Sequence, residues 1–233
     1  QAVENAVATL ERYPDDYDLK HALAQHNALG MEHIVLGNGS NDVLDLIARV
    51  FLAPGRSAVF SQHAFAVYPL ASMAAGAELI AVPAKDFGHD LDAMRAAIRP
   101  DSRLIWIANP NNPTGTFLPY PQLKAFMQAV PADVVVVLDE AYNEYIPPAE
   151  HVDTTTWLAE FPNLVITRTF SKIYGLAGLR IGYALASAEI ADLMNRVRQP
   201  FNCNNLALAA ATAALDDHEF VARSHELNRA GME

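Results

Sequence analysis

The stretch Val134-Val-Val-Val-Leu-Asp-Glu-Ala-Tyr142 contains five consecutive aliphatic residues followed by two carboxylates. Apolar side chains at every position of Val134–Leu138 predict a strand that is buried on both faces, as in a parallel sheet covered by helices. Asp139 then lies at the carboxyl end of that strand, where open α/β sheets bind their ligands. This stretch therefore predicts both the fold class and the edge of the sheet at which a site would form.

Outward from this strand, apolar runs alternate with segments of helical periodicity along the whole chain. Further strands are expected at 34–36, 58–60, 78–82, 103–108, 164–169 and 181–186. Helices are expected at 3–10, 19–29, 42–52, 64–75, 91–98, 120–130, 157–161, 189–198, 206–215 and 219–232. The alternation predicts an α/β fold, a doubly wound, mostly parallel sheet sandwiched by helices.

Composition limits the class of protein. The 233 residues are 52% hydrophobic and 18% charged, as in a globular protein that buries a sizeable core. The net charge of −11 argues against nucleic acid or an anionic membrane surface as a partner. Cys203 is the only cysteine, the histidines lack metal-ligand spacing, and no apolar run has the length of a membrane span. We therefore expect a cytoplasmic, metal-free protein.

Both ends of the sequence lie within helical patterns. The chain begins at Gln1 and stops at Glu233 with neither a capping residue nor an initiating methionine. We therefore expect residues 1–233 to be a fragment of a longer protein. A natural short protein trimmed at both ends is the alternative.

Lys172 lies in the turn Thr169-Phe-Ser-Lys-Ile-Tyr-Gly-Leu-Ala-Gly-Leu-Arg180, between two expected strands. The hydroxyls of Thr169 and Ser171 and the guanidinium of Arg180 could hold a phosphate by charge-assisted hydrogen bonds. A lysine beside a bound phosphate can form a Schiff base with a phosphorylated aldehyde, which points to pyridoxal phosphate (PLP). On this segment alone, a surface lysine next to a glycine turn is an equal alternative.

Two other loops also follow expected strands. Gly37-Asn-Gly-Ser-Asn-Asp42 leads into a helix, with Ser40 as the expected N-cap and with free backbone amides at the positive helix end. A plain glycine turn with a serine cap explains this loop equally well. Asn109-Pro-Asn-Asn-Pro-Thr-Gly115 is a stronger signal, because its two prolines fix a turn that aims asparagine amides at the sheet edge.

Asp139 needs a partner, because an unpaired carboxylate at the end of a buried strand is costly to desolvate. A pyridinium N–H would be such a partner, and Tyr142 could reach the phenolic oxygen of the same ring. An aspartate that caps the next helix is the alternative.

Phe65, in Gln62-His-Ala-Phe-Ala-Val-Tyr68, could stack on a flat ring, although an aromatic residue at this spacing is more often part of the core. His63 and Tyr68 are expected to be exposed loop residues without an assigned role.

Together, these motifs resemble the class-I/II aminotransferases of PLP fold type I, and most of all the histidinol-phosphate aminotransferases. The resemblance covers nearly the whole chain. It implies that Lys172 carries the cofactor and shuttles a proton, that Asp139 pairs with the pyridine nitrogen, and that Phe65 stacks on the ring. Asn112 and Tyr142 would hold the phenolic oxygen. The implied phosphate ligands are Ser40, Asn41, Thr169, Ser171 and Arg180, with Tyr13 reaching the phosphate of a neighbouring subunit in a homodimer.

The resemblance implies amino transfer from histidinol phosphate to 2-oxoglutarate in histidine biosynthesis. Members of this family are longer, with an N-terminal arm and a small C-terminal domain, so residues 1–233 correspond to the PLP-binding large domain. Whether this chain is active by itself is left open. An aromatic aminotransferase, an amino-acid decarboxylase, a C–S lyase and a PLP-binding domain without turnover are alternatives. A dinucleotide-binding protein is disfavoured because the Gly-x-Gly-x-x-Gly fingerprint is absent.

Overall fold

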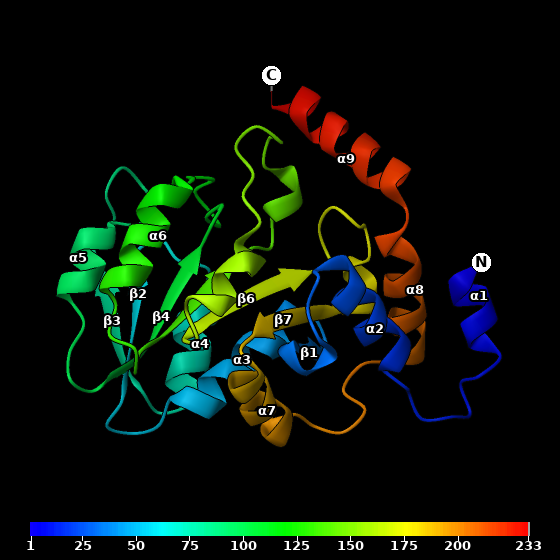
Figure 1. The fold of residues 1–233 in the computed structure, drawn as a ribbon, viewed down its shortest axis with the longest axis horizontal. Helices are drawn as coiled ribbons and strands as arrows, with labels where there is room; N and C mark the ends of the chain where they lie inside the picture. Colours follow the sequence, from blue (N-terminus) through cyan, green and yellow to red (C-terminus); the bar gives the residue numbers. More distant parts are fainter. Residues whose placement is uncertain (233) are drawn as a thin grey trace.

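A central sheet with helices on both faces organises the protein (Figure 1). The computed structural model describes residues 1–232, and within them the sheet has the strand order β1-β7-β6-β5-β4-β2-β3. The strands are β1 (Ile34–Gly37), β2 (Ser57–Ser61), β3 (Glu78–Val82), β4 (Ser102–Ala108), β5 (Val135–Asp139), β6 (Leu164–Thr169) and β7 (Gly182–Ala186). The α-helices are α1 (Ala2–Val7), α2 (Tyr17–His26), α3 (Ser40–Phe51), α4 (Val67–Ala74), α5 (Leu91–Ala96), α6 (Tyr120–Ala129), α7 (Ala188–Val197), α8 (Asn205–Leu215) and α9 (His218–Gly231).

The direction of the strands brings the ends that precede the predicted site loops to one edge of the sheet. Strands β2 to β6 pair in parallel, whereas β7 is antiparallel to both β6 and β1. In register, Asp139 lies between Ala108 and Thr167, and Thr169 lies beside Gly182. Because β7 runs in reverse, its amino end meets the carboxyl ends of its neighbours. The predicted doubly wound, mostly parallel sheet is confirmed.

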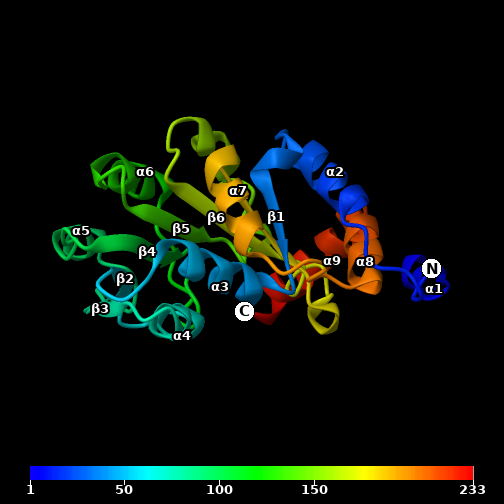
Figure 2. The same ribbon diagram turned by 90° about the horizontal axis from the view of Figure 1, so that it is seen from below.

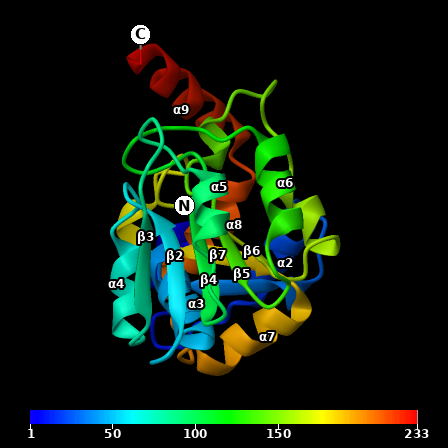
Figure 3. The same cartoon turned by 90° about the vertical axis from the view of Figure 1, so that its left-hand side faces the viewer.

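Alternate side chains of the strands enter two separate cores. Val136 and Leu138 belong to the core that includes residues of α2, α5, α6 and α8, whereas Val135 and Val137 belong to the core that includes α3, α4 and α7. Figures 2 and 3 accordingly show α4 and α6 on opposite sides of the sheet. Burial on both faces explains why the sequence of β5 is continuously apolar rather than alternating.

The C-terminal helix lies apart from these layers. α9 extends away from the sheet (Figure 1), and none of its described residues is buried. The described helices include none that combines the length and the apolar character needed to cross a bilayer.

Four local expectations were wrong. Ser40 is not an N-cap but the first residue of α3, and Gly39 is the N-cap with a φ of 85° and no side-chain hydrogen bond. The helix after β2 begins at Val67 rather than at residue 64, and Tyr68, expected in an exposed loop, is fully buried. The short helix expected at 157–161 is a 3₁₀ helix at Thr154–Ala159.

A buried ion pair ties the ends of β5 and β6 together. Arg168 Nη2 lies 2.8 Å from Glu140 Oε2, and both side chains are almost completely buried. Thr154 donates to the other carboxylate oxygen, and Arg168 also donates to Asn27 Oδ1. A buried pair is stabilising only when such hydrogen bonds satisfy it, and here it anchors the segment that presents Asp139.

Candidate active site

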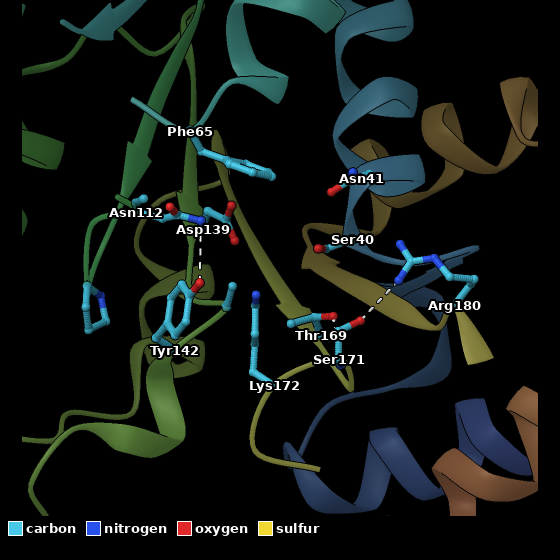
Figure 4. A pocket seen from close by; sticks show the side chains of 13 residues that line it. Ser40, Asn41, Phe65, Asn112, Asp139, Tyr142, Thr169, Ser171, Lys172 and Arg180 are labelled. Carbon is cyan, nitrogen blue, oxygen red and sulfur yellow. Dashed lines mark hydrogen bonds between the residues drawn. The ribbon is translucent and has the colours of Figure 1, made fainter. Parts of the chain in front are cut away.

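A cavity of about 230 Å³ opens at the edge where the strand ends meet. Its lining comes from β1–α3, β2–α4, β4, β5 and the loop between β6 and β7 (Figure 4). The lining residues are Ser40, Asn41, Phe65, Ala108, Pro110, Asn112, Asp139, Ala141, Tyr142, Thr169, Ser171, Lys172 and Arg180. All the predicted site residues except Tyr13 therefore lie around one cavity.

Asp139 forms the floor of this cavity. The side chain is 5% exposed, and Oδ1 accepts a hydrogen bond from Thr167, its partner in the β5–β6 register, at 3.0 Å. Tyr68 donates to Oδ2 at 2.7 Å. Burial raises the pKa of the Asp139 carboxyl, and these hydrogen bonds act against that rise. No cationic side chain among residues 1–232 lies within ion-pair distance of Asp139, so the site offers a desolvated carboxylate to a positive group.

Asn112 and Tyr142 form one wall. Asn112 Nδ2 lies 3.4 Å from the Tyr142 hydroxyl, so both point to the same place in the cavity (Figure 4). The other asparagines of this loop hold its shape, because Asn109 bonds to Leu118 and Asn111 bonds to the His63 carbonyl. Two asparagines thus anchor the loop, and the third, Asn112, lines the cavity.

Lys172 stands between this wall and the opposite one (Figure 4). Its Nζ lies 5.1 Å from the centroid of the Tyr142 ring. Buried Phe170 and Ile173 flank the lysine in sequence, and the Lys172 carbonyl accepts from Gly175 N, which closes a turn. The chain has four lysines, at positions 20, 85, 124 and 172, and only Lys172 lines this cavity.

The opposite wall, which we call the anion wall, consists of groups that can donate hydrogen bonds to an anion: Ser40, Asn41, Thr169, Ser171 and Arg180. Ser40 and Asn41 begin the 12-residue helix α3, whose amino end carries a partial positive charge. Thr169 Oγ1 accepts from Ser171 N, which leaves the threonine hydroxyl proton free to donate. Arg180 Nη1 donates to the Ala177 carbonyl at 2.9 Å and lies 3.5 Å from Ser171 Oγ. Within residues 1–232 no carboxylate lies within 4.0 Å of this guanidinium, so its charge is available to a ligand.

The backbone on this side is strained. Arg180 has a φ of 59°, in the left-handed region that non-glycine residues rarely occupy, and such conformations cluster at ligand sites. Gly39 has a φ of 85°, and a Cβ atom there would collide with the Arg180 guanidinium. Glycine at position 39 is therefore what lets the arginine lie against the start of α3.

Gly39→Ala is expected to destabilise the protein by about 1–3 kcal/mol and to displace Arg180, which should weaken phosphate binding. Gly55→Ala is the matched control, because Gly55 has a φ of 84° but open space around its Cβ position. Thermal unfolding should show similar losses in both variants. Equal affinities for PLP in the two variants would contradict the role of Gly39 in placing Arg180.

Two predicted site residues remain, Phe65 and Tyr13, and only Phe65 lies at the cavity. Phe65 lines the cavity and packs edge-on against Tyr68, with ring centroids 5.8 Å apart. Tyr13 lies elsewhere; it is 79% exposed and stacks on Phe201 at 4.6 Å. Its role toward a neighbouring subunit stays a prediction.

Sequence reasoning missed Tyr68 as a site residue. The signal that could have found it is its spacing, since Tyr68 follows Phe65 by three residues, one helical turn. In the helix expected at 64–75, this spacing would have placed both rings on one face.

Comparison with known proteins agrees with this geometry. The sequence profile described as "Aminotransferase class I and II" matches residues 3–233. The chain belongs to the class I and II aminotransferase family. Histidinol-phosphate aminotransferase 1 of Dechloromonas aromatica (strain RCB) is 74% identical over 233 residues, which cover 100% of this chain and 64% of that protein. This aminotransferase chain thus spans less than two thirds of the length of that relative.

Solved structures show the same fold. The crystal structure of histidinol-phosphate aminotransferase from Sinorhizobium meliloti in complex with pyridoxal-5'-phosphate has a TM-score of 0.92 and 34% identity, covering 97% of this chain and 62% of that one. L-threonine-O-3-phosphate decarboxylase from Porphyromonas gingivalis has a TM-score of 0.85 and 26% identity, covering 98% and 68% of the respective chains. The resemblance to histidinol-phosphate aminotransferases indicated by the motifs is confirmed.

Proposed function

We propose that this chain is the PLP-binding large domain of an aminotransferase that moves an amino group from histidinol phosphate to 2-oxoglutarate in histidine biosynthesis. The observation that carries the proposal is the 74% identity, over the whole chain, to a histidinol-phosphate aminotransferase. The arrangement of the cavity supports the cofactor independently of that identity.

The residues around the cavity fit the chemical groups of PLP. Asp139, buried and without a cationic neighbour among the described residues, suits a protonated pyridine nitrogen. The unpaired Arg180, the hydroxyls of Thr169 and Ser171, and the start of α3 suit a phosphate. Asn112 and Tyr142 suit the phenolic oxygen, and Phe65 suits a face of the ring.

These side chains have distinct tasks in amino transfer. When bound, PLP supplies an electron sink for the charge that develops on a substrate carbon. Asp139 would hold the proton on the ring nitrogen and thereby maintain that sink. Lys172 Nζ would hold the cofactor covalently and, when released, accept and return a proton. The anion wall would fix the phosphate so that the reacting atoms stay in place.

We infer further that the protein works as a homodimer in the cytoplasm. The exposed Tyr13 in its Tyr-Pro-Asp turn is suited to reach a neighbouring subunit, and the single cysteine fits a reducing compartment. Light scattering on the purified protein tests the dimer, because a monodisperse monomer would exclude a shared site.

The substrate is tested by a single half-reaction. PLP-loaded protein mixed with L-histidinol phosphate is expected to release the corresponding 2-oxo compound and to retain pyridoxamine phosphate, as measured by absorbance and mass spectrometry. L-threonine O-3-phosphate and aromatic amino acids serve as competing donors. Carbon dioxide release from threonine phosphate, with no amino transfer from histidinol phosphate, would favour a decarboxylase instead.

A further inference from the structure

Tyr68 contacts the site residue Asp139 without lining the cavity. It lies on α4, is 0% exposed and is absent from the lining of the cavity, yet its hydroxyl donates to Asp139 Oδ2 at 2.7 Å. Thr167 donates to Oδ1 at 3.0 Å. Each carboxylate oxygen therefore accepts from a fixed hydroxyl and retains acceptor capacity for a further partner.

The aromatic stack around Tyr68 holds that hydroxyl in place. The Tyr68 ring is stacked on Trp106, with centroids 5.1 Å apart and an interplanar angle of 2°. Trp106 is itself fixed, because its indole N–H donates to buried Ser72 at 3.0 Å. Phe65, which lines the cavity, packs edge-on against the Tyr68 ring. Packing on this scale leaves Tyr68 little freedom to turn away from Asp139.

In the hydrogen bond between Tyr68 and Asp139, the proton is bound to the tyrosine oxygen. Burial raises the pKa of Tyr68 well above its ordinary value, and the nearby Asp139 carboxylate raises it further. Burial also raises the pKa of Asp139, while the Tyr68 and Thr167 hydrogen bonds lower it and neighbouring Glu140 raises it. A donor to the charged form of a carboxylate favours that form. Tyr68 thus counteracts the effect of burial on the group at the floor of the cavity.

We propose that Tyr68 is a positioning residue, whose hydroxyl orients Asp139 and keeps it ionised so that it can receive a cationic ring nitrogen. The identity of that ring rests on the proposed function. The action of Tyr68 on Asp139 does not, and it can be measured without any ligand.

The first test is a carboxyl titration in ligand-free protein. Tyr68→Phe removes the hydroxyl and keeps the stacked ring, so the pKa of Asp139 should rise by about one to two units in ¹³C NMR of labelled aspartate. The Asp139 signal is assigned from its absence in Asp139→Asn. Tyr120→Phe is the control, because Tyr120 is likewise buried, at 6% exposed, but belongs to the opposite core. An unchanged Asp139 titration in Tyr68→Phe overturns the inference.

The second test is a double-mutant cycle on PLP affinity. Tyr68→Phe should raise the dissociation constant of PLP about tenfold or more in the unsubstituted background and leave it unchanged in the Asp139→Ala background. A role limited to packing would weaken binding equally in both backgrounds, and that result also overturns the inference. Failure of the unsubstituted protein to bind PLP would count against the proposed function, whereas the carboxyl titration would still decide the role of Tyr68.

Discussion

Lys172→Ala is expected to reduce amino transfer by many orders of magnitude while PLP still binds without a covalent bond. Lys172 is the only lysine that lines the cavity, and the reaction loses both its nucleophile and its proton carrier when Nζ is removed. The anion wall and Asp139 remain, so part of the binding energy is retained. Stopped-flow absorbance with L-histidinol phosphate measures the rate, and equilibrium dialysis measures PLP affinity.

Lys124→Ala provides the control for this prediction. Lys124 is partly exposed and forms an ion pair with Glu160 at 2.7 Å, away from the cavity. Its replacement should leave the rate of amino transfer within about twofold, since surface ion pairs contribute little. A Lys172→Ala protein that keeps a substantial fraction of the rate would show that another group supplies the chemistry.

Asp139→Asn is expected to lower the rate of amino transfer by roughly a hundredfold to several thousandfold. An amide cannot hold a pyridinium proton by charge, and breaking a buried ion pair at one partner typically costs about 3–5 kcal/mol. The asparagine keeps the size of the side chain, but only its remaining oxygen can accept, so one of the two hydroxyl donors, Tyr68 or Thr167, loses its acceptor. Turnover within tenfold of the unsubstituted protein would refute the role of Asp139.

Although Asp139→Asn should lower the rate of amino transfer, we do not expect it to lower the stability of the ligand-free protein. Because burial raises the pKa of Asp139 in the folded protein, the folded state binds more protons than the unfolded state between the two pKa values. Stability of the ligand-free protein therefore falls as the pH rises through that window, and the ionised carboxylate is unfavourable above it. Asp139→Asn should consequently unfold at the same temperature as the unsubstituted protein or at a higher one at pH 7. A lower unfolding temperature would show that the carboxylate already has a compensating partner.

The sequence was most informative where a local pattern reports burial directly. The unbroken apolar run of β5 indicated a strand covered on both faces, and the next residue, Asp139, lies on the floor of the cavity. The loops after β1, β4 and β6 contribute to the same cavity because parallel strands place their carboxyl ends at one edge. Strand direction and loop composition are enough for that prediction.

Features that depend on tertiary packing could not be predicted. Tyr68 was assigned to an exposed loop because its burial depends on the stack with Trp106, which is 38 residues away in sequence. The buried pair of Glu140 and Arg168 joins two strands through side chains that look solvated in the sequence. Ser40 was expected to cap α3 because serine favours that position, but the positive φ of Gly39 places the cap one residue earlier.

Borohydride reduction of the protein with PLP, followed by peptide mapping, tests most directly whether this cavity is a PLP site. Reduction makes the bond between the cofactor and its lysine permanent, so mass spectrometry identifies the residue. Of the four lysines, we expect the pyridoxyl group on Lys172 alone, and Lys172→Ala should abolish the labelling. Labelling of Lys20, Lys85 or Lys124 in place of Lys172, or no stable labelling at all, would contradict the assignment of the cavity.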